Sequence, residues 1–326
     1  MSQPTGTPVA EAFYKLRPLL FSIAYRMLGS VTEAEDIVQE AFVRYHGAVT
    51  DHGEPDSPKA YLSTIVTRLC IDQLHSARVR RESYVGEWLP EPLLTGPEPL
   101  VRPAADPAAH AEQSDSLSMA FLLLLERLTP LERAVFLLHD VFGYDYDETS
   151  GIVSRSPANC RQLAHRARQH VEADRPRFDV TAEQKSQLAA RFFEAVEQGD
   201  MAGLVSMLAA DVSVHGDGAG AGLTWRKPIV GREHVGRLLA NLGRLLHSVD
   251  GSLRAVEVNG QPGALVLTSD GSLIGVLSLD IADGQVQTFR SVINRDKLRH
   301  LGPLADIPAL IEQRRGPDSN APASAS

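Results

Sequence analysis

The sequence has little of what marks a secreted, membrane or metal-binding protein. Its 326 residues include two cysteines, Cys70 and Cys160, which form no CxxC pair and no metal-ligand spacing with histidine. Residues 1–10 lack the basic and apolar blocks of a signal peptide, and no apolar run approaches the roughly 20 residues of a membrane span. We therefore expect a cytoplasmic protein with reduced thiols, no cofactor, no metal and no membrane contact.

Positive charge is also scarce. Lysine and arginine total 32 against 41 aspartates and glutamates, which gives a net charge of −9. Proteins that bind DNA alone are usually basic, because phosphate contacts supply much of the affinity. The composition therefore argues weakly against autonomous DNA binding, but it permits a protein that meets DNA as part of a larger complex.

Residues 10–81 carry three successive helical patterns. The length of the chain allows two or three compact units, and this segment is the first of them. Ser30 and Glu33 form a capping box before the second pattern, and Ser57-Pro58 is a favourable start for the third. We expect a turn-rich loop over residues 46–56.

Residues 82–114 contain six prolines, which forbid a long helix and predict a linker. The linker nevertheless includes the apolar stretch Trp88-Leu89-Pro90-Glu91-Pro92. A free linker has little use for this much apolar surface, so we expect the stretch to dock on another part of the protein.

Residues 115–175 are helical again and carry a helix-turn-helix pattern. A short helix over 147–153 precedes a restart at Ser156-Pro157 and a second helix with one apolar stripe. The other positions of that helix are rich in arginine, asparagine and glutamine, the side chains that pair with guanine and adenine edges. The alternative interpretation is a solvated basic helix face.

Residues 178–302 predict an α+β domain. A helix over 188–196 closes at Gly199, and strand-like runs follow at 211–215, 253–258, 264–268, 273–279 and 286–293. Asn-Gly and Asp-Gly pairs between the later runs predict hairpins and a curved antiparallel sheet. Residues 303–326 form a tail whose last part is polar and small, which is typical of disorder.

Residues 33–44 resemble the second conserved region of extracytoplasmic-function sigma factors. In that family this helix docks on the largest subunit of RNA polymerase. The resemblance implies a core-binding face made of Glu35, Asp36, Gln39 and Glu40. The residues alone also allow a solvated acidic face.

Residues 60–81 resemble the family segment that opens and reads the −10 promoter element. The resemblance implies that the loop 46–56 forms the wall of a pocket for unstacked bases. Tyr61 would stack on a base, and Arg68, Arg78, Arg80 and Arg81 would contact phosphates. A tyrosine beside Leu62 fits a core position equally well.

Residues 128–138 and the helix-turn-helix resemble the family's fourth region, which reads the −35 element in duplex DNA. The resemblance implies near-base positions for Asn159, Arg161, Gln162 and His165. It implies phosphate contacts for Arg155, Arg166 and Arg168. Such contacts position the protein on DNA but do not read the base sequence. Ser154 departs from the glycine that is common at this turn.

The remainder resembles a subgroup with a C-terminal SnoaL-like domain of the cone-shaped nuclear-transport-factor-2 fold. The matching segments are 88–92, 217–222 and 294–298. The resemblance implies interdomain contacts through Trp88, Leu89, Pro90, Asp217, Gly218, Gly220, Asn294, Asp296 and Lys297. The partners it implies are core RNA polymerase and promoter DNA, with regulation in cis and no requirement for a separate anti-sigma factor.

Two other interpretations remain at this point. One is a one-component helix-turn-helix regulator with a ligand-sensing domain. The other is a SnoaL-type enzyme, for which the polar candidates are Asp211, His215, Asp217, Trp225, His234 and His247. No spacing among these side chains requires an acid–base pair, so we expect a protein that is not an enzyme.

Overall fold

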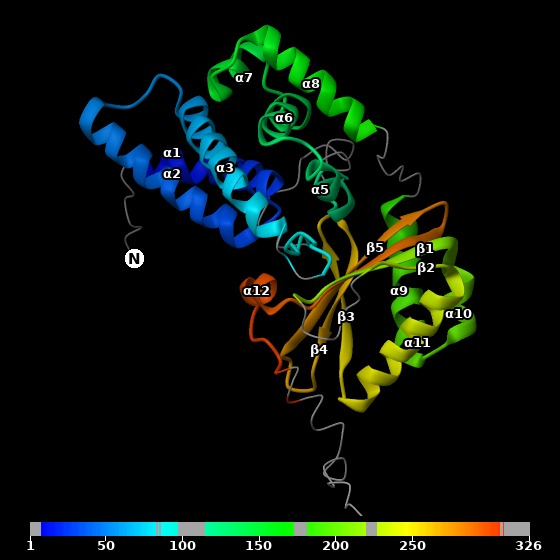
Figure 1. Ribbon diagram of the computed structural model, residues 1–326. Coiled ribbons are helices and arrows are strands. Elements are labelled where there is room, and N and C mark those ends of the chain that lie inside the picture. Colours follow the sequence, from blue (N-terminus) through cyan, green and yellow to red (C-terminus); the bar gives the residue numbers. More distant parts are fainter. Residues whose placement is uncertain are drawn as a thin grey trace, which may run out of the picture. The chain divides into compact units, whose positions relative to one another are not determined.

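The computed structural model describes residues 8–82, 84, 86–96, 115–172, 181–219, 227–306 and 309. The chain divides into two compact units (Figure 1). The first contains residues 1–84 and 88–177 and is helical, while the second contains residues 85–87 and 178–326 and combines helices with a sheet.

The first unit begins with three long helices, α1 (Pro8–Leu28), α2 (Val31–His52) and α3 (Pro58–Glu82). The predicted cap at Ser30 is confirmed, because its hydroxyl accepts a hydrogen bond from the Glu33 amide. The predicted loop 46–56 is wrong over most of its length, since α2 continues to His52. The helix ends at Gly53, whose positive φ of 83° favours glycine and whose N–H bonds to the Val49 carbonyl.

Shorter helices complete this unit. They are α5 (Met119–Leu125), α6 (Pro130–Phe136), the π-helical η1 (Leu137–Val141), α7 (Tyr146–Val153) and α8 (Pro157–Glu172). The predicted helix-turn-helix is α7 and α8. Ser154 ends α7 in the left-handed conformation, with φ 53° and ψ 50°, and so supplies the turn that glycine would otherwise make.

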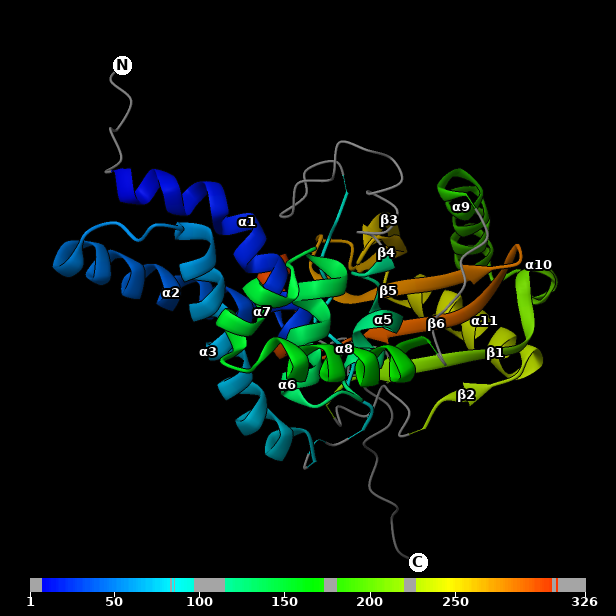
Figure 2. The ribbon, with the colours of Figure 1, turned by 90° about the horizontal axis from the view of Figure 1, so that it is seen from above.

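Buried residues of α1–α3 and of α5–α8 form a continuous hydrophobic core that runs from Phe13 to Val171. Helix α3 packs on α6 and α7, and α1 contacts α6 and η1. Figure 2 shows α3, α6 and α7 side by side. The two helical segments of the sequence therefore fold into a shared body.

In the second unit, helices α9 (Ala182–Gln198), α10 (Met201–Met207) and α11 (Arg232–Ser248) gather beside the sheet (Figure 1). The strands are β1 (Leu208–Asp217), β2 (Ile229–Val230), β3 (Ser252–Val258), β4 (Gln261–Leu267), β5 (Leu273–Ala282) and β6 (Gln285–Val292). The unit ends with α12 (Arg295–Leu298) and the 3₁₀ turn η2 (Arg299–Leu301). Asn259-Gly260 and Asp283-Gly284 have positive φ at both positions, as two-residue hairpin turns require.

The sheet corrects the prediction of an antiparallel fold. Its order is β2-β1-β6-β5-β4-β3, and β1 pairs with β6 in parallel while the other neighbours are antiparallel. Strands β3 to β6 form a meander through three short turns, which brings β6 back beside β1 in the same direction. The sheet is therefore mixed.

Helix α11 was not predicted, and its glycines explain why. Gly236 and Gly243 lower helix propensity, but both allow close packing. A Cβ atom on Gly243 would overlap the carbonyl oxygen of Val196, so α11 approaches the backbone of α9 through this residue. Val235, Leu239 and Leu246 bury the same side of the helix.

Candidate functional site

Helix α2 presents an acidic face to solvent. Asp36, Gln39 and Glu40 are exposed, and Glu40 pairs with Arg44 at 2.7 Å. Glu35 is half-buried, and its carboxylate accepts a 2.5 Å hydrogen bond from Arg17 of α1. Glu35 is therefore partly committed to the fold, whereas Asp36 and Gln39 are available to a partner.

Val43 extends this face by one helical turn. It lies three and four positions after Glu40 and Gln39, and its side chain is 64% exposed. Exposed valine beside exposed carboxylates is the composition of a docking face with an apolar centre and a charged edge. The sequence reasoning missed Val43, although the spacing 36, 39, 40, 43 would have found it.

The residues predicted to contact the −10 element differ in burial and in their hydrogen-bond partners. The Tyr61 ring is half-buried and lies 6.2 Å from the Tyr45 ring, so it lines the edge of the core. Arg68 is exposed, but its guanidinium donates to the Ile152 carbonyl at 3.2 Å and to the Ser154 hydroxyl at 2.7 Å. Arg78, Arg80 and Arg81 lie on the last turns of α3, and their side chains are outside the described residues.

Helix α8 carries an exposed polar face. Arg161, Gln162 and His165 are exposed and lie within one helical turn, with Asn159 half-exposed nearby. The Arg161 guanidinium lies 5.3 Å from the centre of the Tyr146 ring, a cation–π distance that orients it without using its hydrogen-bond donors. These donors remain free to address a planar acceptor such as a base edge.

The three arginines predicted to contact phosphate differ from one another. Arg155 is exposed and donates to the Ser154 carbonyl. Arg166 pairs with Glu132 at 3.2 Å and Arg168 with Asp140 at 2.7 Å. The hydrogen bond from Arg168 to Asp140 raises the pKa of Arg168 further above its ordinary value. Arg168 thus has a structural partner, which a phosphate would have to displace.

The apolar linker stretch docks on the first unit, in the turn between α1 and α2. The Glu91 carboxylate accepts hydrogen bonds from the Ser30 hydroxyl at 2.7 Å and from the Val31 and Thr32 amides at 2.8 and 3.0 Å. It therefore neutralises the positive end of the α2 dipole as an added cap. The backbone of Glu91 also bonds to Gly29 and to the Tyr25 hydroxyl.

Gly29 makes this docking possible. It has a φ of 66°, and a Cβ atom there would lie 2.9 Å from the Trp88 ring. The glycine allows both the left-handed turn and the approach of the indole. Leu89 and Pro90 are buried beside it, so all three predicted linker residues contact the protein interior.

In the second unit the structure brings Asp217, Asn294 and Lys297 together. The Lys297 ammonium donates to the fully buried Asp217 carboxylate at 2.6 Å, and the Asp217 carbonyl accepts from the Asn294 amide. Gly218 follows directly and is buried, whereas Gly220 is outside the described residues. Asp296 lies apart, exposed and paired with Arg299. Asp217 thus meets the 294–298 segment inside one domain.

A chain of polar contacts also joins the linker to β1. The His215 ring contacts the Glu87 carboxylate at 2.6 Å through Nδ1 and the Ser213 hydroxyl at 3.1 Å through Nε2. Glu87 belongs to the second unit, four residues before Glu91 in the first. The sequence reasoning missed Glu87 because its partner lies 128 positions away.

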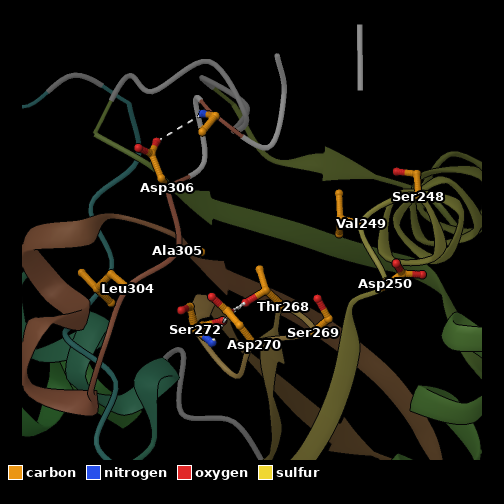
Figure 3. Close-up of a pocket in the computed structure, with 11 residues that line it drawn as sticks. Ser248, Val249, Asp250, Thr268, Ser269, Asp270, Ser272, Leu304, Ala305 and Asp306 are labelled. Carbon is orange, nitrogen blue, oxygen red and sulfur yellow. Dashed lines mark hydrogen bonds between the residues drawn. The ribbon is translucent and has the colours of Figure 1, made fainter. Parts of the chain in front are cut away.

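The enzyme candidates do not converge. Asp211, His234 and His247 are exposed, and Trp225 lies outside the described residues. A polar hollow of about 590 Å³ opens between the end of α11 and the β4–β5 turn (Figure 3). Two of its carboxylates serve local turns, since Asp270 accepts from Thr268 and Ser272, and Asp306 accepts from Ala309.

The hydrogen bonds from Thr268 and Ser272 hold the pKa of Asp270 below its ordinary value, so this carboxylate is a weak base. Within the described part of the chain, no group of three His, Cys, Asp or Glu side chains is arranged to hold a metal ion. The same residues contain no helix that is long and apolar enough to cross a membrane.

Comparison with known proteins assigns each part of the chain to a family. Residues 13–80 match sigma-70 region 2, residues 118–171 match sigma-70 region 4, and residues 189–295 match the SnoaL-like domain. The chain is 35% identical over 293 residues to the ECF RNA polymerase sigma factor SigJ of Mycobacterium tuberculosis, covering 87% of this chain and 91% of SigJ. The chain belongs to the extracytoplasmic-function sigma factors.

Two further comparisons agree with this assignment. The probable sigma factor SigI of M. tuberculosis is 33% identical over 295 residues, covering 89% of this chain and 95% of SigI. The crystal structure of M. tuberculosis SigJ superimposes with a TM-score of 0.69 at 33% identity, covering 91% of this chain and 100% of SigJ. The predicted fold class, two helical sigma segments followed by a SnoaL-like domain, is confirmed for this sigma factor.

Proposed function

We propose that this sigma factor binds core RNA polymerase through the exposed acidic face of α2 and directs it to promoters. Helix α3 reads the −10 element and α8 the −35 element. The observation that carries this proposal is that a single unit presents the acidic stripe ending in Val43 and the exposed Arg161, Gln162 and His165. The net charge of −9 fits a subunit that reaches DNA with the electrostatic help of the polymerase.

In vitro transcription with core polymerase from a mycobacterium tests this function. On a promoter library, core polymerase with the full chain is expected to yield transcripts whose templates share two upstream elements. Core polymerase alone is expected to yield no such transcripts. Failure to bind core at low ionic strength would contradict the proposal. Sequence-specific DNA binding without any association with core would instead support the one-component regulator.

We further propose that the SnoaL-like domain regulates initiation in cis, in the cytoplasm and without a separate anti-sigma protein. The support comes from the linker. Glu87 is held by His215 within the second unit, and Trp88 and Glu91 are held within the first. Only three residues separate Glu87, which the SnoaL-like domain holds, from Glu91, which the α1–α2 turn holds. A movement of the SnoaL-like domain would therefore pull on the α1–α2 turn.

The His215→Ala substitution tests this regulation, since it removes the contact that holds Glu87. We expect it to change promoter-dependent transcription by about 2- to 30-fold, the range that corresponds to the energies typical of coupling between sites. His234→Ala is the matched control, because His234 is exposed on α11 of the same domain. Equal transcription from both variants and the unaltered chain would contradict regulation through the linker.

A further inference from the structure

Tyr146, the first residue of α7, contacts side chains of both η1 and α8. The His139 ring of η1 stacks on the Tyr146 ring, with the ring centres 3.9 Å apart and the planes at 23°. The guanidinium carbon of Arg161 lies 5.3 Å from the centre of the same ring. The Tyr146 hydroxyl accepts a 3.3 Å hydrogen bond from Arg168. One half-buried tyrosine therefore connects η1, α7 and α8.

Backbone groups fix the surroundings of the Tyr146 ring. His139 Nδ1 lies 2.8 Å from the Tyr144 carbonyl oxygen. A carbonyl oxygen only accepts, so Nδ1 carries the hydrogen in this contact. Asp145, the residue before Tyr146, caps α7 and forms a capping box with Glu148. The imidazole and the backbone that carries the tyrosine are therefore held in place within the protein itself.

The π-helical turn η1 supplies two neighbouring residues to this cluster. His139 stacks on the ring, and Asp140 accepts a 2.7 Å hydrogen bond from Arg168. Single π-helical turns are rare, and many of them lie at functional sites. Here one turn holds both the ring face of Tyr146 and the arginine that bonds to its hydroxyl. The tyrosine is thus fixed at its ring and at its polar end.

Arg161 differs from the other polar residues of α8. Arg166 and Arg168 pair with carboxylates, and the His165 ring shares a 3.2 Å hydrogen bond with Gln169. Arg161 is instead held over an aromatic ring, a contact that uses none of its N–H donors. A bidentate contact to a base edge needs a guanidinium whose plane is oriented and whose donors are available. The ring contact of Arg161 provides both.

Orientation before binding matters most for a long side chain. An exposed arginine samples many rotamers, and a bidentate contact must restrict it to one of them. A ring that already restricts the guanidinium lowers this entropic cost, so more of the contact energy appears as affinity for the correct base. The gain is confined to the contact that Arg161 makes. It should therefore appear as a change in base preference at one position.

We propose that Tyr146 is a positioning residue for the −35 element: its ring, fixed by His139, holds the Arg161 guanidinium in the orientation that reads a base edge. This inference rests on the proposed function, because it concerns how α8 reads promoter DNA. Tyr146 acts through Arg161 and contacts no base itself. It determines how strongly one base pair is preferred.

Transcription by core polymerase with the full chain, on a library randomised over the −35 element, tests the role of the ring. Tyr146→Leu removes the ring but keeps an apolar side chain. We expect it to weaken the preference at the base pair that Arg161→Ala identifies by about 2- to 5-fold, the range for a cation–π contact at an exposed site. Tyr146→Phe keeps the ring and loses the hydroxyl that accepts from Arg168, so it should retain that preference. In the Arg161→Ala background, Tyr146→Leu should change the preference no further, because the two residues act together.

An NMR measurement on the free full chain tests the contact without polymerase or DNA. The Nε–Hε signal of Arg161, assigned by its absence from Arg161→Ala, responds to the ring current of an aromatic side chain beside it. We expect this signal to shift in Tyr146→Leu and to stay close to its original position in Tyr146→Phe. An identical signal in the unaltered chain and in both Tyr146 variants would overturn the proposal. Thermal unfolding of the variants shows whether either substitution destabilises the fold.

The proposed function and the positioning role fail in different ways. If core polymerase does not bind the chain, the proposed function fails, while the NMR comparison still decides whether the ring holds Arg161. If Arg161→Ala changes the preference at one base pair and Tyr146→Leu does not, the proposed function stands and the positioning role is overturned. An equal loss at every promoter position in Tyr146→Leu, with reduced thermal stability, would identify a merely structural tyrosine and would also overturn it.

Discussion

Replacing Asp36 with lysine is expected to weaken association with core RNA polymerase by about 100-fold or more. Asp36 is the first residue of the exposed stripe that runs from Asp36 to Val43 on α2, and no hydrogen bond or ion pair within the described residues occupies its carboxylate. If the polymerase presents complementary positive charge, lysine removes an attraction and adds a repulsion. Like charges placed opposite each other across an interface cost several kcal/mol.

The measurement is a binding titration of the full chain against core polymerase without DNA. Asp51→Lys is the matched control, because Asp51 is also exposed on α2 and the charge change is identical. The stability of both variants is compared by thermal unfolding. An equal loss of binding in the two variants would show that net charge, and not the position of Asp36, causes the loss. No loss in either variant would show that core polymerase binds another face of the protein.

Arg161→Ala is expected to cost about 1–3 kcal/mol of binding energy at one position of the −35 element and to relax the preference for one base there. The Arg161 side chain is exposed and held over the Tyr146 ring, and its neighbours Gln162 and His165 share its face. The contact with the Tyr146 ring leaves the N–H donors of the Arg161 guanidinium available for a bidentate contact to guanine. Transcription from a library randomised over the −35 element measures the loss at each position.

Arg166→Ala provides the comparison for this result. Arg166 pairs with Glu132 and was predicted to contact phosphate, so its loss should weaken all promoters uniformly and reduce the salt dependence of binding. A uniform loss for Arg161→Ala as well would identify Arg161 as a phosphate contact. A position-specific loss for Arg166→Ala would instead place that residue among the base-reading side chains.

Local patterns accounted for much of the fold. The cap at Ser30, the start at Pro58 and the helix-turn-helix follow from side chains within four positions of one another. Non-local features did not follow from sequence. The parallel pairing of β1 with β6 depends on the path of the whole meander, and the π-helical turn η1 extends α6 where no residue signals it. Helix α11 escaped prediction because its packing glycines resemble helix breakers.

The candidate site shows the same division. Exposure of Asp36 and Arg161 could be predicted from the opposite, apolar side of each helix. The engagement of Arg168 by Asp140 and of Arg68 by Ser154 could not, since these partners lie 28 and 86 positions apart. The linker stretch was expected to dock, but its target depended on the shape of the α1–α2 turn, which a tryptophan ring and a glycine define together.

The backbone and the side chain of Ser154 have opposite effects on the stability of the turn between α7 and α8. Its backbone adopts a left-handed conformation that glycine adopts at lower energy, while its hydroxyl accepts the 2.7 Å hydrogen bond from Arg68. A glycine here would relax the turn and leave Arg68 with only its hydrogen bond to the Ile152 carbonyl. Ser154 thus combines a backbone conformation of higher energy with a side chain that ties α3 to the turn between α7 and α8.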